Sequence, residues 1–296
     1  MATVSEKEWT GFQGLPAATQ IILHTLLAKL RKQKVDKITI VLLGKGGVGK
    51  SSIVNSLFSE RVAAVSAFRS ETLRPRQYSR SKDGFKLTVI DTPGFVEAGR
   101  VDAALNSIRR YLLGKTINVV LYVDRLDGPR EDKVDVKISR AISQAFGPQI
   151  WPHVIVVFTH AEIHLEDVTY SEFVSRRSAA LRNIILKESR FKTVNTKVPF
   201  VLVENCSRCS ENGEHEKILP DGTVWLPVLF EALVDLVLGS KKPILIDEKM
   251  IGIPKGNPLG SIWMPLVLLA QFVLIWRPIR KAIDRDLVEE AQRHSP

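Results

Sequence analysis

The chain has 296 residues, of which 42 are basic and 32 acidic, so its formal net charge is +10. Hydrophobic residues make up 45% of it, which excludes a disordered or collagen-like chain because there is ample apolar material for a large core. Two cysteines, Cys206 and Cys209, are too few for a disulfide framework and favour a reducing compartment. They are also too few for a four-ligand zinc site, and we interpret them as incidental or weakly redox-sensitive.

The N-terminal part predicts a helix that packs on the main domain. It contains no apolar core of a signal peptide, and Ala2 stands where N-myristoylation requires glycine. After Pro16, a good first-turn residue, Ile22 and the leucines at 23, 26, 27 and 30 follow helical spacing. We expect residues 1–37 to form an N-terminal helical extension.

Short apolar runs then alternate with helical patterns. Strands are predicted at 38–43, 87–90, 118–123, 154–158 and 198–203, and helices near 101–113, 132–146, 170–189 and 226–238. Nearly continuous apolar runs are typical of strands buried on both faces, and Asp83-Gly84 predicts a hairpin. Together they predict an α/β domain over residues 38–240, with a mostly parallel sheet and helices on both of its faces.

The first predicted strand leads directly into a phosphate-binding motif, Gly44-Lys45-Gly46-Gly47-Val48-Gly49-Lys50-Ser51, which matches G-x-x-x-x-G-K-[ST]. In such a loop, backbone N–H groups surround phosphate oxygens and the next helix presents its positive N-terminus. Lys50 is expected to reach the β- and γ-phosphates, and the Ser51 hydroxyl to bind Mg²⁺. The candidate nucleotide-binding residues here are Lys45, Gly46, Gly47, Val48, Gly49, Lys50, Ser51 and Ser52.

A second motif, Asp91-Thr92-Pro93-Gly94, follows the strand at 87–90. It is the D-x-x-G of P-loop GTPases, in which the aspartate lies near Mg²⁺ through water and the glycine N–H contacts the γ-phosphate. Asp91 comes 47 residues after Gly44 and ends a strand, so the two motifs support each other. We therefore expect Asp91 at the Mg²⁺ and Gly94 at the nucleotide.

The first switch loop is expected between Ser66 and Pro75, with Ser66 and Arg69 as nucleotide contacts. Candidates to complete the Mg²⁺ shell are the hydroxyls of Ser70 or Thr72 and the main-chain carbonyls near Phe68 or Arg69. Phe95 follows the D-x-x-G motif, where many GTPases carry a glutamine that orients the attacking water. We therefore predict slow intrinsic hydrolysis of GTP to GDP and phosphate, with the nucleotide acting as a switch.

Residues after two later strands are candidates for base recognition. The strand at 154–158 runs into Thr159-His160-Ala161-Glu162 instead of the usual N-K-x-D, and Glu204-Asn205 follow the next strand. His160 would stack on the base, and Glu162 occupies the place of the missing aspartate. A carboxylate suits guanine, whose N1–H and N2 amino groups are both donors. Because strand ends in a parallel sheet share one edge, we expect His160, Glu204 and Asn205 at a guanine nucleotide.

The C-terminal part predicts a membrane anchor, with a buried core helix as the alternative. Between Lys255 and Arg277 lie 21 uncharged residues, and a membrane helix needs roughly 20. Trp263 and Trp276 lie near the two ends, as interfacial aromatic residues do. We expect the bulk of the protein to face the cytosol, with a stalk at 241–258, a transmembrane tail anchor at 259–279 and a short polar tail at 280–296.

These motifs in this order resemble those of the small GTPase receptors of the translocon at the outer chloroplast envelope, the Toc GTPases, within the septin-like and immune-associated branch of P-loop GTPases. GKGGVGKSSIVNSL, VIDTPGFVEAG, VVLYVDRLD, ENCSRCS and the N-terminal EWTGF are similar to family segments. The resemblance covers roughly residues 8–280. It implies GTP/GDP and Mg²⁺ as ligands and the chloroplast outer envelope as the location.

The resemblance also implies partners. The family's receptors recognise transit peptides of preproteins and pass them to a β-barrel import channel, and they dimerise across the nucleotide face, with themselves or with a larger Toc GTPase. Arg130 matches the arginine that members extend toward the partner's nucleotide, as a catalytic group or a dimer contact only, and Arg125 belongs to the same loop. Pro129 and Glu162 depart from the family's usual aromatic residue and glutamine.

Other interpretations stay open at this point. The phosphate-binding motif also fits the deviant Walker motif of MinD/ParA-type membrane-associated ATPases, although 43 residues precede Gly44 here. A non-catalytic anchored scaffold with structural GTP and an immune-associated GTPase are further alternatives. The basic cluster between Arg69 and Lys86 has no aromatic platform, so we expect no nucleic-acid partner.

Overall fold

The computed structural model describes residues 7–65, 74–95, 101–128, 133–163, 165–188, 198–239 and 242–247. These residues belong to one compact unit, Met1–Ile251. Among them, no helix is both long and apolar enough to cross a membrane. The predicted anchor at 259–279 lies outside the described residues, and the domain boundaries at residues 37 and 240 stay predictions.

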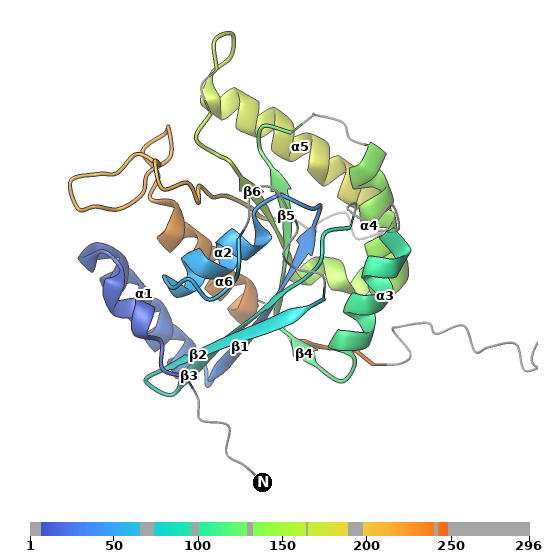
Figure 1. Ribbon diagram of the computed structural model, residues 1–296, viewed down its shortest axis with the longest axis horizontal. Coiled ribbons are helices and arrows are strands. Elements are labelled where there is room, and N and C mark those ends of the chain that lie inside the picture. Colours follow the sequence, from blue (N-terminus) through green and yellow to red (C-terminus); the bar gives the residue numbers. More distant parts are fainter. Residues whose placement is uncertain are drawn as a thin grey trace, which may run out of the picture. The chain divides into compact units, whose positions relative to one another are not determined.

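A six-stranded sheet forms the centre of the molecule, in the order β2-β3-β1-β5-β6-β7 (Figure 1). Its strands are β1 (Lys37–Gly44), β2 (Arg76–Lys82), β3 (Phe85–Asp91), β5 (Val119–Arg125), β6 (Val154–Thr159) and β7 (Phe200–Leu202). Neighbouring strands are parallel except β2 and β3, which form the predicted hairpin through Asp83 and Gly84, both with positive φ. The predicted mostly parallel sheet is therefore confirmed.

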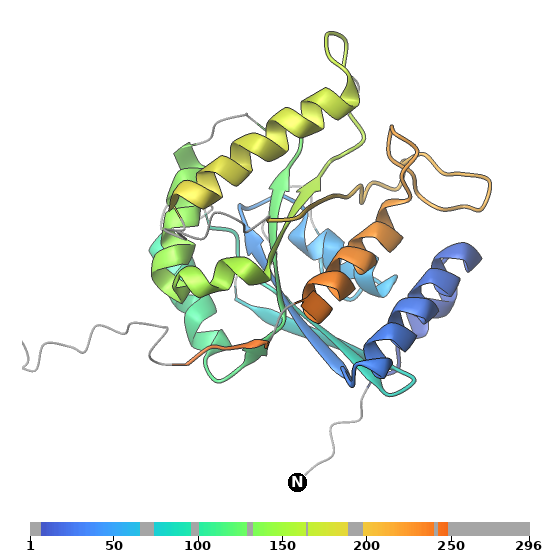
Figure 2. The same cartoon turned by 180° about the vertical axis from the view of Figure 1, so that it is seen from behind.

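Helices cover both faces of the sheet, as the alternating pattern predicts. Figures 1 and 2 show α1, α2 and α6 on one face and α3, α4 and α5 on the other. Their bounds are α1 (Ala17–Lys32), α2 (Lys50–Phe58), α3 (Val101–Leu112), α4 (Lys133–Phe146), α5 (Tyr170–Glu188) and α6 (Trp225–Gly239). Short elements complete the fold: the 3₁₀ helices η1 (Thr10–Gly14) and η2 (Pro148–His153), and an antiparallel pair of β4 (Thr116–Ile117) with β8 (Ile244–Leu245).

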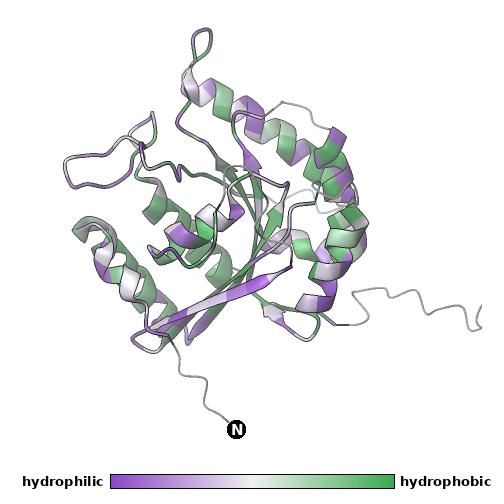
Figure 3. Cartoon of the chain, viewed as in Figure 1, coloured by the Kyte–Doolittle hydropathy of each residue, from purple (hydrophilic) through white to green (hydrophobic). Residues whose placement is uncertain are grey.

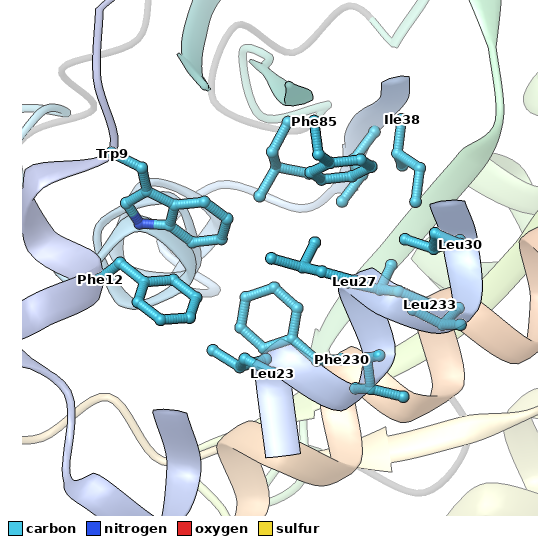
Figure 4. A pocket seen from close by; sticks show the side chains of 13 residues that line it. Trp9, Phe12, Leu23, Leu27, Leu30, Ile38, Phe85, Phe230 and Leu233 are labelled. Carbon is cyan, nitrogen blue, oxygen red and sulfur yellow. The ribbon is translucent and has the colours of Figure 1, made fainter. Parts of the chain in front are cut away.

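The N-terminal helix α1 packs into the core, which confirms the helix predicted after Pro16. Its leucines face α6 and the sheet around an apolar cavity of about 20 Å³, which has room for no more than one or two water molecules (Figure 4). The side chains around it include Trp9, Phe12, Leu27, Phe85 and Phe230. The space between α1, α6 and the sheet is therefore closely packed.

The sheet edge at β2 is hydrophilic along its length, in contrast to the apolar central strands (Figure 3). The N-terminal segment pairs in parallel with the end of this strand. Trp9 N donates to Ser81 O at 2.9 Å, and Ser81 N donates to Lys7 O at 2.9 Å. Trp9 is buried, and its Nε1 donates to Phe58 O at 2.9 Å. The start of the described chain is thus fastened to both the sheet and α2.

Candidate functional site

The phosphate loop lies between β1 and α2, where the sequence predicts it. Gly49 precedes α2 with a φ of +88°, a conformation that suits glycine. Lys50 begins the helix and is 6% exposed. Its Nζ donates to Lys45 O at 2.6 Å and to Gly44 O at 3.4 Å, so the lysine lies across the loop. A cation and a set of backbone N–H groups are therefore gathered at a helix N-terminus, which suits a phosphate group.

The D-x-x-G motif lies against this loop because β3 and β1 are adjacent. Ser51 Oγ donates to Asp91 Oδ2 at 2.6 Å, and Asp91 is buried. A Cβ added to Gly94 would lie 2.4 Å from Gly46 Cα, so the close approach of the two loops requires a glycine there. Phe95 is fully buried. Its side chain therefore cannot take the place of a glutamine that orients water.

The donor set at this point suits Mg²⁺. A hydroxyl oxygen and a carboxylate oxygen are hard ligands, and Mg²⁺ usually takes its remaining ligands from water and substrate phosphates. No group of three or more His, Cys, Asp or Glu able to hold a metal occurs in the described residues. Ser51 and Asp91 therefore fit a magnesium ion that arrives with a nucleotide.

The predicted base-recognition residues meet at the same edge of the sheet. Glu204 is 4% exposed, and its carboxylate accepts from Cys206 N at 2.8 Å and from Glu162 N at 3.2 Å. Asn205 Oδ1 accepts from Ser56 Oγ of α2 at 2.8 Å. The hydroxyl of Thr159, the residue before His160, donates to Val48 O of the phosphate loop at 2.8 Å.

A surface hollow of about 540 Å³ adjoins this group. It is lined by residues of α2 and the segment after it and by Asn205, including Ser52, Ser56 and Arg61. His160 is half-buried and has a positive φ of 52°, which is uncommon for a residue with a Cβ. Such backbone strain is often found at functional sites.

Glu162 has a different environment from Glu204. Its carboxylate accepts from Ser210 N at 3.3 Å and from Ser210 Oγ at 2.7 Å. It therefore fastens the loop after β7 to the loop after β6. Of the two carboxylates predicted near guanine, Glu204 is the buried one and Glu162 the loop-bound one.

Several predicted residues lie outside the described part of the chain: Ser66, Arg69, Ser70, Thr72 and Arg130. Arg125 is described and makes a bidentate pair with Asp127, with N–O distances of 2.8 and 2.7 Å. The hydrogen bonds that Arg125 donates to Asp127 raise the pKa of Arg125. Both side chains are more than one third exposed, so the pair lies at the surface.

The sequence alone does not predict a buried charge cluster beneath the phosphate loop. Lys45 Nζ lies 2.9 Å from Asp135 Oδ1 and 3.3 Å from Asp124 Oδ1, and Arg177 Nη2 pairs with Asp124 Oδ2. Tyr122 OH donates to Asp135 Oδ1 at 3.2 Å. Burial, and next the charge of Asp124, raises the pKa of Asp135. The Lys45 side chain therefore points into this cluster, so in this arrangement a phosphate contact from Lys45 would come from its backbone.

One sequence signal could have indicated the cluster. Arg177 interrupts the apolar face of α5 between Val174 and Leu181, at helical spacing from both. A charged residue on a buried helix face needs a partner of opposite charge. That signal shows that a partner exists but does not identify it.

Taken together, a phosphate loop after the first strand, a serine–aspartate pair from adjacent strands and two further loops at the same sheet edge are the features of a P-loop GTPase. The AIG1 family model matches residues 38–199, which is more than half of the chain. The chain is 42% identical over 290 residues to Translocase of chloroplast 34 from Pisum sativum, covering 97% of this chain and 94% of that protein.

Solved structures of chloroplast translocase GTPases are also similar to this chain in sequence and in fold. Toc33 from Arabidopsis thaliana in complex with GDP and Mg²⁺ is 44% identical, with a TM-score of 0.77 over 81% of this chain and 100% of that one. The Toc33 dimerization deficient mutant R130A is 43% identical, with a TM-score of 0.77 over 80% of this chain and 99% of that one. The chain therefore belongs to the AIG1 family, in the group of chloroplast translocase GTPases.

This membership decides between the alternatives left open by the sequence. It supports a GTPase over a MinD/ParA-like ATPase and over a non-catalytic scaffold. The GDP and Mg²⁺ of the Toc33 complex are the ligands that the sequence motifs predict for this chain. The P-loop GTPase fold predicted from the sequence is confirmed.

Proposed function

We propose that this chain is a tail-anchored GTPase receptor at the chloroplast outer envelope, which recognises transit peptides of preproteins and passes them to a β-barrel import channel. The observation that carries this proposal is the similarity to Translocase of chloroplast 34, which extends over 97% of the chain and is not limited to the nucleotide motifs. The GTPase domain faces the cytosol, where preproteins arrive.

In this proposal the residues at the sheet edge bind GTP as follows. Lys50 neutralises the β- and γ-phosphates, and backbone N–H groups from Gly46 to Ser51 surround them. Ser51 and Asp91 hold Mg²⁺, which stabilises the negative charge that develops on the phosphates. The 2.6 Å distance between Ser51 Oγ and Asp91 Oδ2 supports this assignment. Ser52 contributes at the start of α2, and Gly94 offers its N–H to the γ-phosphate.

Glu204, Asn205 and His160 are proposed to read the guanine base. A carboxylate has about four lone-pair positions, and backbone N–H groups use two of those of Glu204. The others can accept from guanine N1–H and N2. His160 stacks on the base, and Asn205 completes the pocket beside α2.

A matched pair of variants tests this assignment. Glu204→Gln replaces one acceptor by a donor, so GTP affinity should fall about 10- to 100-fold while affinity for xanthosine triphosphate falls less or rises. Glu162→Gln makes the same chemical change at the carboxylate bound to Ser210, and GTP affinity should change less than about 3-fold. Equal losses in the two variants would assign guanine recognition elsewhere. Calorimetric titration of the purified protein with each nucleotide measures both.

Hydrolysis by a single chain is proposed to be slow, because Phe95 is buried and cannot orient water. Dimerisation across the nucleotide face, with a second copy or with the larger Toc GTPase, then brings Arg130 to the partner's nucleotide, with Arg125 in the same loop. A Toc33 variant described as dimerization deficient, R130A, supports a role for such an arginine. Single-turnover GTP hydrolysis over a dilution series tests this: the rate per chain should fall on dilution, and a rapid rate in monomers contradicts it.

Anchoring and receptor function need separate tests. Full-length chain inserted into chloroplast outer-envelope vesicles should lose its GTPase domain to added protease, and removal of residues 259–296 should abolish insertion. For the receptor, residues 1–255 are added to isolated chloroplasts in an import assay. They should reduce the binding of a preprotein but not of the same protein without its transit peptide. No effect on preprotein binding counts against the receptor function.

A further inference from the structure

Four charged side chains meet beneath the phosphate loop: Lys45, Asp124, Asp135 and Arg177. Their exposed fractions are 16%, 3%, 0% and 1%, and their charges balance. Lys45 Nζ lies within 3.3 Å of both carboxylates, and Arg177 pairs with Asp124 on its other side. Arg177 Nη2 also lies 3.8 Å from Asp135 Oδ2. Each aspartate is therefore held between two cations.

The four residues come from separate parts of the nucleotide-binding edge. Lys45 belongs to the phosphate loop, Asp135 to the first turn of α4 and Arg177 to the middle of α5. Asp124 lies in β5, beside the segment Arg125–Gly128. A Cβ added to Gly128 would lie 3.7 Å from Arg177 Nη2, so the guanidinium lies next to that segment as well.

A second link joins the phosphate loop to the same segment. Thr159 Oγ1 donates to Val48 O at 2.8 Å, and Leu126 N donates to Thr159 O at 2.8 Å. The phosphate loop is thus connected to Arg125–Gly128 through Thr159 on one side and through the Lys45 cluster on the other. A change in the position of the loop has two physical routes to this segment.

Stability alone does not explain the cluster. Burying charges is costly, and apolar residues of similar volume are often at least as stable. Within the described part of the chain, Arg177 Nε, Arg177 Nη1 and Asp135 Oδ2 are buried without a hydrogen-bond partner. A second arrangement of the cluster could use these donors and acceptors, which would offset the ion pairs that it gives up.

We propose that Lys45 is a positioning residue that ties the phosphate loop to Asp124 and Asp135. Nucleotide bound in the loop then changes the local stability of the segment Arg125–Gly128. A bound phosphate adds negative charge near Lys45 and draws its ammonium group from the two carboxylates. Asp124 then keeps Arg177 as its remaining ion-pair partner, and Arg177 lies beside Gly128. The inference rests on the proposed binding of nucleotide by this loop. It extends that function, because bound nucleotide would then affect Arg125–Gly128, which belongs to the loop proposed for dimerisation.

The test is amide hydrogen exchange of peptides covering residues 124–128 in the full-length protein, held in nanodiscs, with and without saturating GDP and Mg²⁺. In the wild type, nucleotide should change exchange there by about 5-fold or more. Lys45→Met should remove this response. Lys29→Met, which deletes a lysine from the exposed pair with Asp235, is the matched control and should keep it.

Two further variants separate positioning from charge balance. Lys45→Met combined with Asp135→Asn removes one cation and one anion, so it should recover thermal stability but not the response. If the response returns with stability, Lys45 only balances charge and the proposal is wrong. Asp135→Asn alone leaves the sequence of the phosphate loop unchanged but removes one carboxylate partner of Lys45, so it should weaken the response. If Lys45→Met cannot be saturated with GDP, an unchanged response in Asp135→Asn overturns the proposal.

The same experiment distinguishes failure of the inference from failure of the proposed function. A wild type that does not bind GDP refutes the proposed nucleotide site. A wild type that binds GDP without altered exchange at residues 124–128 refutes the inference alone.

Discussion

Two ionic clusters flank the sheet, and they differ in how completely their hydrogen bonds are made. The first joins Glu60, after α2, to Arg80 of β2. Glu60 Oε1 accepts from Thr10 Oγ1 at 3.0 Å and from Gly11 N at 2.9 Å, and Oε2 accepts from Arg80 at 2.7 and 2.5 Å. The Arg80 guanidinium also lies 5.5 Å from the centre of the Phe58 ring. Both carboxylate oxygens of this cluster are used twice.

The second cluster is the group of Lys45, Asp124, Asp135 and Arg177. It is more deeply buried, yet two nitrogens of Arg177 lack a hydrogen-bond partner among the described residues. The difference between the clusters follows their positions. Glu60 and Arg80 fasten the N-terminal segment to the sheet, whereas the second cluster includes Lys45 of the phosphate loop. Complete hydrogen bonding suits a cluster that keeps its structure, and incomplete hydrogen bonding suits a cluster that rearranges when a ligand binds.

The largest effect is expected for Arg177→Met, which leaves Asp124 and Asp135 with Lys45 alone. Removing one partner of a buried ion pair typically costs about 3–5 kcal/mol of unfolding free energy. The neighbouring Arg176→Met is the control, because Arg176 pairs with Glu172 at the surface and should cost less than about 1 kcal/mol. Urea denaturation of both variants measures the difference, and equal losses would contradict the buried cluster.

A smaller and pH-dependent effect is expected for Glu60→Gln, of about 1–3 kcal/mol at pH 7. Burial alone raises the pKa of Glu60, but hydrogen bonds from Arg80, Gly11 and Thr10 outweigh it and lower the pKa overall. Because the folded-state pKa is below the unfolded one, the carboxylate stabilises the fold above the unfolded pKa. That contribution is lost as the pH falls through the folded pKa. The difference between wild type and variant should therefore shrink below about pH 4, as urea denaturation across pH 3–7 would measure.

A double-mutant cycle sharpens the comparison further. Arg177→Met and Asp135→Asn belong to one cluster, so their effects on unfolding free energy should deviate from additivity by about 0.5–3 kcal/mol. Arg177→Met and Glu60→Gln share no partner and should add within about 0.5 kcal/mol. A large coupling between the two clusters would mean that they are not independent.

The smallest effect is expected for Arg125→Met, although Arg125 directly follows Asp124 in β5. Its pair with Asp127 is exposed, and exposed pairs contribute about 0–1 kcal/mol and weaken with salt. Unfolding in low and in high salt should show that this variant resembles the wild type in stability. A loss comparable to that of Arg177→Met would show that the buried cluster extends into the surface segment.

Local patterns in the sequence predict most of the fold. The helix expected at 101–113 is α3 at Val101–Leu112, and the strand at 154–158 is β6 at Val154–Thr159. These predictions hold because apolar periodicity and glycine spacing are local properties. The pair of β4 and β8 escapes prediction, since two residues in each strand carry no pattern.

The site is predicted less evenly than the fold. Glycine-rich and D-x-x-G motifs identify the phosphate end because their chemistry is contained in adjacent residues. The pairing of Arg177 with Asp124 joins residues 53 positions apart, and only the fold shows it. Likewise, only the fold shows that Glu204 is buried and accepts from Cys206 N, whereas Glu162 accepts from Ser210.

The parallel pairing of the N-terminal segment with β2 has a consequence for assembly. An edge strand exposes backbone N–H and C=O groups to which another chain can add a strand, and native proteins guard such edges by covering them or by charging them. Here Lys7 and Trp9 cover the end at Ser81, and the basic residues Arg76 and Lys82 stand at the two ends of β2. A chain whose sheet edge is guarded in this way can meet a partner through another surface without growing into an extended cross-chain sheet.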